Sequence, residues 1–213
     1  AIRRQRQMCI RDRQCTDITL ELNDSLMTKV LDSGTVSTSP DFVLTGTCTT
    51  SFQTSGANRS NNIVVGASRL NNLIVMPGQT VSVSDTILPR TRANGYKEAG
   101  VYVNGAHTTG LGGGVCQISS TVYNAVKNAG LTVVQRNPHS MPVNYLPKGL
   151  DAAIAAGSKD LKFRNDYTTP VVLYTDTSNK HLTVNVLVWN QELAGRSFKL
   201  WAKQTGALSA DTY

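Results

Sequence analysis

The sequence predicts an α+β domain in which a mostly antiparallel β-sheet packs against two helices. Three observations indicate this class. Short stretches rich in Val, Thr and Leu are bounded by turn residues, as is typical of strands. Two segments repeat apolar residues at helical spacing. Asn104-Gly105 and Thr177-Ser178-Asn179 indicate hairpins, which join antiparallel neighbours. Strands of this kind packed on helices make an α+β arrangement.

The expected domain covers residues 42–202. Of the 213 residues, 40% are hydrophobic and 16% are charged, which is typical of a globular chain. Residues 1–41 are expected to be a tail or linker, partly non-native or the remnant of an upstream domain, because residues 7–13 resemble translated adaptor sequence. Residues 203–213 are predicted to form a C-terminal tail.

The net charge of +7 comes mostly from the first 13 residues, where five arginines and one aspartate give +4. No aromatic residue interleaves with these arginines, so no stacking surface accompanies the charge and nucleic acid is not an expected partner. No apolar run is long enough to span a bilayer, so stable membrane insertion of this fragment is not expected. The oligomeric state stays open.

The first half of the domain is expected to alternate strands and one helix. A strand over residues 42–52 precedes a helix over about 60–72, which Asn58 or Ser60 could cap. A Pro-Gly turn at Pro77 then leads into a strand that ends near residue 83. The following segments are a polar loop over residues 89–95 and a hairpin over residues 96–109.

The second half contains the second helix, over residues 115–129, with one apolar stripe and Gly130 as its terminator. A strand over residues 131–135 follows, and prolines stiffen the turn over residues 136–142. Residues 151–156 are apolar and could form a strand or a short helix. The remaining predicted strands cover residues 161–164, 171–175, 182–189 and 198–202.

The stretch Gly110-Leu111-Gly112-Gly113-Gly114-Val115-Cys116 leads directly into the second helix. Backbone N–H groups at a helix start lack partners within the helix, and the helix dipole favours negative charge there. A cysteine in this place should have a lowered pKa and more thiolate, which is its nucleophilic form. The pattern predicts Cys116 as a nucleophile at a helix N-terminus, although a free cysteine is also commonly a small buried apolar residue.

A cysteine nucleophile needs a base that is near in space. The chain contains His107, His139 and His181. The strand and turn over residues 131–138 would span roughly 25 Å, and the helix before them spans ~22 Å, so an antiparallel return can bring His139 back to the helix start. His139 is therefore the predicted base. His107 stays an alternative, and His181 is expected to be solvated at a hairpin tip.

Asp151, twelve residues after His139, is the predicted third group that orients the base, with a turn or cap role as its alternative. Asp160 and Asp166 are less favoured because they lie in turn-like stretches. The backbone N–H of Cys116 and of a neighbouring glycine could hold the oxyanion of an acyl intermediate. The residues predicted to contact substrate are Gly112, Gly113, Gly114, Gln117 and Ser140.

No cofactor and no metal are predicted. The glycine run is not followed by Gly-Lys-Ser/Thr, as in a P-loop, and it lacks the dinucleotide-binding spacing. The four cysteines, Cys9, Cys15, Cys48 and Cys116, show no zinc-site spacing, although a Cys/His/Asp metal site stays an alternative. A disulfide among Cys9, Cys15 and Cys48 stays open.

Motifs over about residues 45–190 share their order and spacing with one protein family. They include Asn58-Arg59-Ser60-Asn61-Asn62-Ile63, Gly112-Gly113-Gly114-Val115-Cys116-Gln117-Ile118-Ser119-Ser120-Thr121, His139-Ser140-Met141-Pro142-Val143 and Gly149-Leu150-Asp151-Ala152. On these residues the chain resembles the VanW family. It departs from the family pattern at Leu150, where an arginine is usual, and at Cys48, where an aromatic residue is more typical.

The resemblance implies an extracytoplasmic protein of the bacterial cell envelope, with any export signal or anchor outside this fragment. Some VanW-domain proteins are assigned as L,D-transpeptidases. Such enzymes form a thioester with the third residue of a peptidoglycan stem peptide and pass it to a second stem as a 3-3 cross-link. This implies Cys116 as nucleophile, His139 as base and Asp151 as its partner. The alternatives are hydrolysis of the same stem peptides and a non-catalytic peptidoglycan-binding accessory role linked to glycopeptide resistance.

Overall fold

The computed structural model describes residues 42–103 and 106–189, which form an α+β fold with antiparallel strand pairing. Strands β1 (Phe42–Ser51), β9 (His181–Trp189), β8 (Val171–Asp176) and β2 (Leu73–Val75) make a four-stranded sheet in that order. A three-stranded sheet has the order β3 (Thr80–Ser82), β7 (Lys162–Arg164) and β6 (Thr132–Gln135). Strands β4 (Glu98–Val103) and β5 (Ala106–Leu111) form a separate two-stranded sheet.

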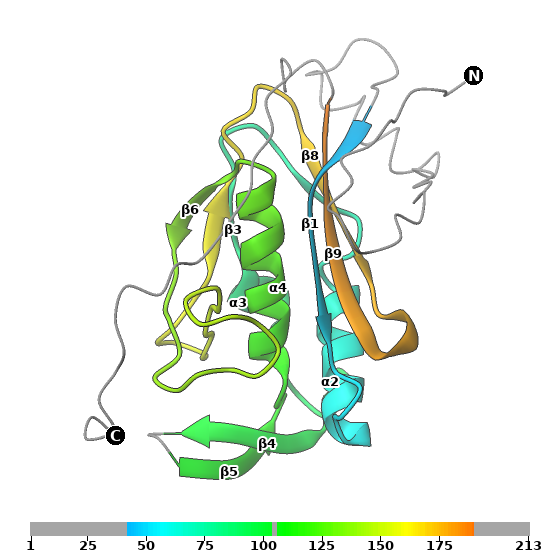
Figure 1. Ribbon diagram of the computed structural model, residues 1–213, viewed down its shortest axis with the longest axis vertical. Coiled ribbons are helices and arrows are strands. Elements are labelled where there is room, and N and C mark those ends of the chain that lie inside the picture. Colours follow the sequence, from blue (N-terminus) through cyan, green and yellow to red (C-terminus); the bar gives the residue numbers. More distant parts are fainter. Residues whose placement is uncertain (1–41, 104–105, 190–213) are drawn as a thin grey trace.

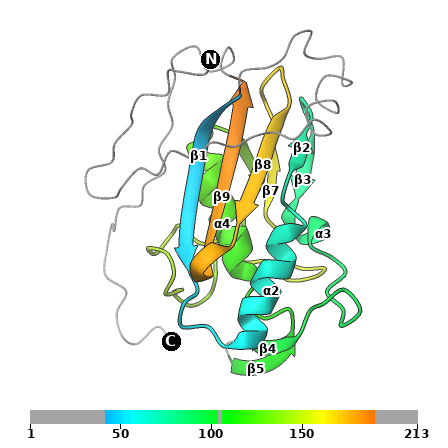
Figure 2. The same cartoon turned by 90° about the vertical axis from the view of Figure 1, so that its right-hand side faces the viewer.

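Helix α4 (Val115–Asn128) is the central element of the fold. Figure 1 shows it between the four-stranded sheet and the β3–β7–β6 sheet. Its apolar residues Ile118, Val122 and Val126 are fully buried, in the same core as residues of β9. In the perpendicular view, the broad face of the four-stranded sheet lies in front of α4 (Figure 2).

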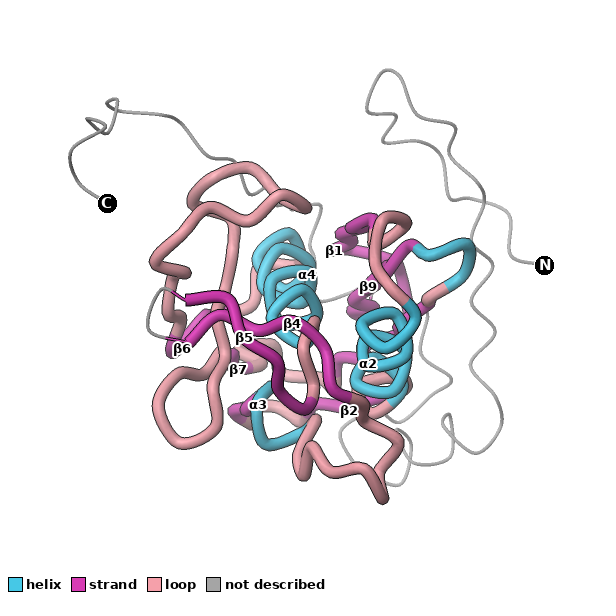
Figure 3. The backbone as a smooth tube through the Cα atoms, turned by 90° about the horizontal axis from the view of Figure 1, so that it is seen from below, coloured by secondary structure: helices cyan, strands magenta, loops and turns pink. Residues whose placement is uncertain are grey.

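Helix α2 (Ala57–Ser68) lies beside the N-terminal half of α4, and the β4–β5 hairpin crosses the end of the molecule where both helices begin (Figure 3). Two short helical turns complete the described elements: α3 (Val83–Thr86) follows β3, and the 3-10 turn η1 (Ser178–Lys180) joins β8 to β9. The hairpin and α2 thus surround the start of α4, where Cys116 lies.

Strand β1 approaches α4 so closely that only glycine fits at position 46. A Cβ atom on Gly46 would overlap the carbonyl oxygen of Ala125 and would lie 2.6 Å from the amide nitrogen of Ala129. The β1–β9 register also shifts between Leu44 and Gly46. The missing side chain lets the strand backbone rest directly on the last turns of the helix.

The predicted class and the antiparallel pairing are confirmed, but the prediction of one sheet is wrong. The predicted apolar stripe covers one side of α4, whereas ten of its 14 residues are buried, among them Gln117, Ser119 and Ser120. A helix buried on this many sides needs cover on both flanks. The strands therefore divide into sheets on either side of it.

Several predicted bounds are corrected. The first helix begins at Ala57, and its N-cap is Gly56, which provides no side-chain cap. Neither predicted cap is correct: the Asn58 amide donates to the Glu98 carbonyl, and the Ser60 hydroxyl donates to the Ser55 carbonyl. The apolar segment over residues 151–156 is neither strand nor helix, apart from one bridge at Ala155.

Some elements were missed by the sequence analysis, and some predictions concern residues outside the described ranges. Elements β2 and α3 were not predicted. The predicted strand over 198–202, both predicted tails and the turn residues Asn104 and Gly105 lie outside the described ranges, although Val103 pairs with Ala106 as that hairpin requires. Over residues 42–103 and 106–189, no helix has the length and apolar character needed to cross a membrane.

Candidate functional site

Cys116 is the second residue of α4, directly after the turn formed by Gly112, Gly113 and Gly114. Gly112 and Gly114 have φ angles of 80° and 111°, in the left-handed region that side chains rarely adopt. The turn therefore depends on glycine at both positions. It delivers Cys116 to the first turn of the helix, where backbone N–H groups have no helical partner.

The glycine turn is held in place by α2 and β4. The fully buried Asn62 of α2 donates to the carbonyl oxygens of Lys97 (2.9 Å) and Gly113 (3.0 Å) and accepts from the Lys97 N–H (2.7 Å). A Cβ on Gly113 would lie only 2.5 Å from the Gly100 carbonyl oxygen. These contacts hold the turn against α2 and β4, and the turn thereby positions Cys116.

Asp151 and His139 form a close ion pair. One carboxylate oxygen of Asp151 accepts from both the backbone N–H and the ring Nδ1 of His139, each at 2.7 Å. Its other oxygen accepts from Nη2 of Arg136 at 3.2 Å, and Arg136 Nε donates to the Asp151 carbonyl at 2.7 Å. The bond to Nδ1 fixes the ring orientation and leaves Nε2 free for another partner.

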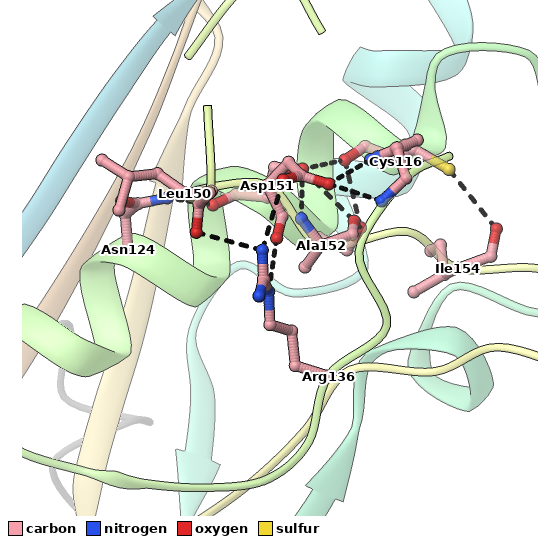
Figure 4. Close-up of polar contacts among 11 residues, drawn as sticks. Cys116, Asn124, Arg136, Leu150, Asp151, Ala152 and Ile154 are labelled. Carbon is pink, nitrogen blue, oxygen red and sulfur yellow. Dashed lines mark hydrogen bonds and ion pairs between the residues drawn. The ribbon is translucent and has the colours of Figure 1, made fainter. Parts of the chain in front are cut away.

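Buried polar residues of α4 dock the segment that carries Asp151. The Ser120 hydroxyl accepts from the Ala152 N–H at 2.9 Å, the Ser119 hydroxyl donates to the Ala152 carbonyl at 2.6 Å, and the Asn124 amide donates to the Leu150 carbonyl at 2.7 Å. Figure 4 shows this segment lying along the helix, with Arg136 reaching Asp151 from the other side. The helix that carries Cys116 thus also positions Asp151.

The Cys116 thiol points toward the same segment, where it donates to the Ile154 carbonyl at 3.4 Å (Figure 4). Burial raises the pKa of Cys116, but a hydrogen bond with the His139 side chain, a backbone hydrogen bond with Ile154, and the charges of His139 and Arg90 outweigh it. The net pKa is below the ordinary value, so a larger fraction of Cys116 is thiolate than in an unperturbed cysteine. The His139 ring, which is paired with Asp151, thus also influences the pKa of Cys116.

The pKa values of His139 and Asp151 shift in opposite directions. Burial lowers the pKa of His139, but hydrogen bonds with Cys116 and Asp151 outweigh it, so this pKa lies above its ordinary value. Burial raises the pKa of Asp151, yet the hydrogen bonds from His139 bring it below its ordinary value. All three shifts favour a thiolate, an imidazolium and a carboxylate.

The other predicted residues are placed differently. Gln117 is 1% exposed. Its side-chain amide accepts from Arg59 and donates to the Thr50 hydroxyl and the Ser51 carbonyl, so these bonds link helix α4 to α2 and β1. Ser140, next to His139, is exposed to solvent.

The alternative residues His181, Asp160 and Asp166 have other partners. His181 begins β9, and its Nδ1 contacts the Asn179 carbonyl at 2.9 Å. The backbone of His107 lies in β5. Asp160 accepts from Ser82 and Ser84, and Asp166 pairs with Arg164.

Cys48 is the second cysteine among the described residues, and it provides a contrast. It is unpaired, packs against the core, and burial raises its pKa to about 12, so it remains a thiol at neutral pH. Across residues 42–103 and 106–189, no group of three or more His, Cys, Asp or Glu side chains is placed to hold a metal ion.

Three residues near Cys116 were not identified from the sequence as parts of the site. Arg59 lies in α2, Arg90 in the loop after α3, and Tyr145 in the segment between His139 and Asp151. Burial lowers the pKa of Arg59, and Cys116 and Tyr145 contribute to its electrostatic environment. Burial also raises the pKa of Tyr145, and this outweighs the opposing effect of Ser120. Arg90 and Tyr145 lie outside the sequence motifs, and only the fold brings them near Cys116.

Comparison with known proteins places this arrangement in a family context. The sequence model described as "VanW like protein" matches residues 58–187. The uncharacterized protein YoaR of Bacillus subtilis (strain 168) is 42% identical over 128 residues, which cover 60% of this chain and 42% of YoaR. The vancomycin B-type resistance protein VanW of Enterococcus faecalis (strain ATCC 700802 / V583) is 35% identical over 114 residues, which cover 51% of this chain and 42% of that protein. The chain thus spans less than half the length of both relatives, and no solved structure matches it.

Proposed function

This chain belongs to the VanW family, and on that premise we propose that it is a cysteine acyltransferase of the bacterial cell envelope that acts on peptidoglycan stem peptides. The observation that carries the proposal is the Asp151–His139 ion pair, whose imidazole lowers the pKa of the Cys116 thiol. A nucleophile, a base and a group that orients the base are the parts that acyl transfer through a thioester requires.

In the first half of the reaction, the Cys116 thiolate attacks the carbonyl of the third residue of a donor stem peptide. A tetrahedral intermediate forms, and the imidazolium of His139 gives its proton to the departing amine of the fourth residue. The C–N bond breaks, the fourth residue leaves as a free amino acid, and a thioester on Cys116 remains. Asp151 keeps the ring oriented and stabilises its charged form.

In the second half, an amine of an acceptor stem peptide attacks the thioester. His139 takes the proton of that amine, the C–S bond breaks, and the thiolate is restored with its imidazolium partner. The product is a 3-3 cross-link. Water in place of the amine would give hydrolysis of the same thioester, so the acceptor decides the outcome.

The negative oxygen of both tetrahedral intermediates needs donors that are already in place. The backbone N–H of Cys116 and of an adjacent glycine are suited to this task, because they lie at the positive end of the α4 dipole. The fixed glycine turn holds them at constant positions during the reaction. The resistance role named for the Enterococcus relative supports a cell-wall substrate.

Mass spectrometry of the protein with a synthetic stem tetrapeptide tests the proposal. The intact protein is expected to gain the mass of the tripeptide acyl group, and Cys116→Ala is expected to gain none. Cys48→Ala is the matched control and should react as the intact protein does, because Cys48 remains a thiol at neutral pH. Muropeptide analysis of cells that express each variant then measures 3-3 cross-links.

Two results would refute this mechanism. One is an adduct that persists in Cys116→Ala. The other is the absence of any adduct, with 3-3 cross-linking equal in cells carrying the intact protein and Cys116→Ala. Peptidoglycan pull-down that persists under the second result would instead support a non-catalytic binding role. Release of free tripeptide in the presence of an amine acceptor would identify a hydrolase.

A further inference from the structure

Arg90 carries a buried guanidinium nitrogen for which the described residues offer no partner. Its Nη1 atom is inaccessible to solvent and makes no hydrogen bond. No carboxylate of residues 42–103 or 106–189 lies within ion-pair distance of Arg90, since the ion pairs found there involve other arginines. A buried donor without a partner is costly, particularly when it belongs to a charged group. Such a group marks a place where an acceptor from a ligand would be stabilised.

Arg90 lies directly against the glycine turn in front of Cys116. A Cβ on Gly112 would be 2.9 Å from Cδ of Arg90, so the aliphatic part of this side chain packs on the turn. Its positive charge also acts on the Cys116 sulfur and favours the thiolate. The unpartnered cation therefore belongs to the surroundings of the thiol.

A second arginine contacts the same turn without a carboxylate partner among the described residues. Cγ of Arg59 would be 3.0 Å from a Cβ on Gly114. Its guanidinium donates to two neutral groups, the Ser55 hydroxyl at 2.5 Å and the Gln117 carbonyl oxygen at 2.8 Å. Arg59 thus adds positive charge, but its outer nitrogens are already occupied. Among the described residues, neither arginine at the turn is paired with a carboxylate.

We propose that Arg90 binds the free α-carboxylate of the residue that departs when Cys116 attacks, so that the site selects peptides ending one residue beyond the scissile carbonyl. The planar guanidinium fork matches a carboxylate in both geometry and charge. Consecutive residues are about 3.8 Å apart, so such a carboxylate lies close to the reacting carbonyl, as Arg90 lies close to the thiol. This inference rests on the proposed function and deepens it by naming the group that specifies the donor.

Binding without turnover tests the inference separately from the chemistry. The protein carries Cys116→Ala, and the probes are a stem tetrapeptide ending in D-alanine as the free acid and the same peptide with a C-terminal amide. A hydrogen bond to a charged group corresponds to about a tenfold to hundredfold change in affinity. Calorimetry is therefore expected to show the acid binding about ten to a hundred times more tightly than the amide.

Adding Arg90→Gln should remove that preference, and Arg90→Lys should keep only part of it, because lysine retains the charge but not the fork. Arg92→Gln is the matched control. This neighbouring arginine is paired with Glu98, its side chain is 71% exposed, and it should leave the preference intact. Thermal unfolding verifies that each variant is folded, and Arg90→Lys serves as the test if Arg90→Gln does not fold.

Equal affinity for acid and amide would overturn the inference, as would a full preference in the folded Arg90 variant. Failure of the acid to bind at all would also overturn it. If the preference depends on Arg90 but the protein with Cys116 intact forms no thioester, the carboxylate site stands and the proposed acyl transfer fails. The two proposals can therefore be refuted independently.

Discussion

Replacing Asp151 with Asn is expected to raise the pKa of the Cys116 thiol and slow its reaction with electrophiles. The carboxylate accepts three hydrogen bonds, two from His139 and one from Arg136. An Asn amide has one acceptor oxygen and one donor nitrogen. In either orientation, its nitrogen would face a donor of His139 or Arg136, and the negative charge that stabilises the imidazolium would be lost.

The magnitude follows from the bond between Asp151 and the ring of His139. A hydrogen bond to a charged group contributes about 1.5–3 kcal/mol, and a neutral one about 0.5–1.5 kcal/mol. The difference of about 1–1.5 kcal/mol is close to a factor of ten. The equilibrium between thiol with imidazole and thiolate with imidazolium should shift about tenfold toward the neutral pair. Alkylation of Cys116 near neutral pH should slow by about the same factor.

The assay is the rate of iodoacetamide alkylation as a function of pH, followed for each cysteine-containing peptide by mass spectrometry. Cys48 serves as an internal reference, because its raised pKa of about 12 keeps it unreactive near neutral pH. Asp160→Asn is the matched control, since Asp160 bonds to Ser82 and Ser84 rather than to His139. A folded Asp151→Asn protein that alkylates at the rate and pH dependence of the unmodified protein would refute this reasoning.

Three further changes test the packing and the electrostatics. Gly113→Ala should displace Cys116, because the new Cβ would lie 2.5 Å from a backbone oxygen. A displacement of about 1 Å can lower the rate about a hundredfold, which the rate of thioester formation would show. Gly56→Ala is the control and should react normally, because nothing lies within 4 Å of its Cβ position. Gly46→Ala should lower the free energy of unfolding in urea by at least about 1–3 kcal/mol through overpacking on α4, and an unchanged midpoint would contradict the close contact. The pKa of Asp151 in the folded protein is below its ordinary value of 3.8, since bonds from His139 outweigh burial, so its stabilising contribution is present above that value and lost as pH falls through the folded-state pKa. The difference in melting temperature between the unmodified protein and Asp151→Asn should therefore shrink below about pH 4, and a constant difference down to about pH 2 would show that Asp151 does not act through its charge.

The elements that could be predicted best are those whose signals are local. The helix over residues 115–129 carries a 3.6-residue apolar period and a terminating glycine, and it occurs as α4 within one residue at its end. The strand over residues 42–52 occurs as β1. The prediction of a strand or helix over residues 151–156 was wrong because the conformation of this segment depends on distant contacts. Their backbone is bonded to Ser119 and Ser120 of a distant helix, and these contacts override any local preference for strand or helix.

The sequence predicted Cys116 from its position at a helix start, His139 from a match of strand and helix lengths, and Asp151 from its spacing to His139; the structure brings Asp151 and His139 into contact. Arg136 escaped prediction as the second partner of Asp151, because the contact joins the end of β6 to a separate loop. Gln117 appeared available for substrate because it neighbours Cys116. The helical rotation between adjacent residues instead turns its side chain toward Arg59 and β1.

Local signals in the sequence predict the turn before Cys116, helix α4 and the chemical groups of the candidate site. These features include a turn that needs glycine at positions 112 and 114, a helix with Cys116 in its first turn, and a histidine and an aspartate of the right type for a base and its partner. Which of these groups meet depends on contacts between segments that are distant in the sequence. The tertiary structure divided the strands around α4, docked the Asp151 segment on buried serines, and brought Arg59 and Arg90 to the turn before Cys116. The physical reason is that periodicity and turn chemistry act over a few residues, whereas ion pairs and burial depend on contacts between segments far apart in the chain.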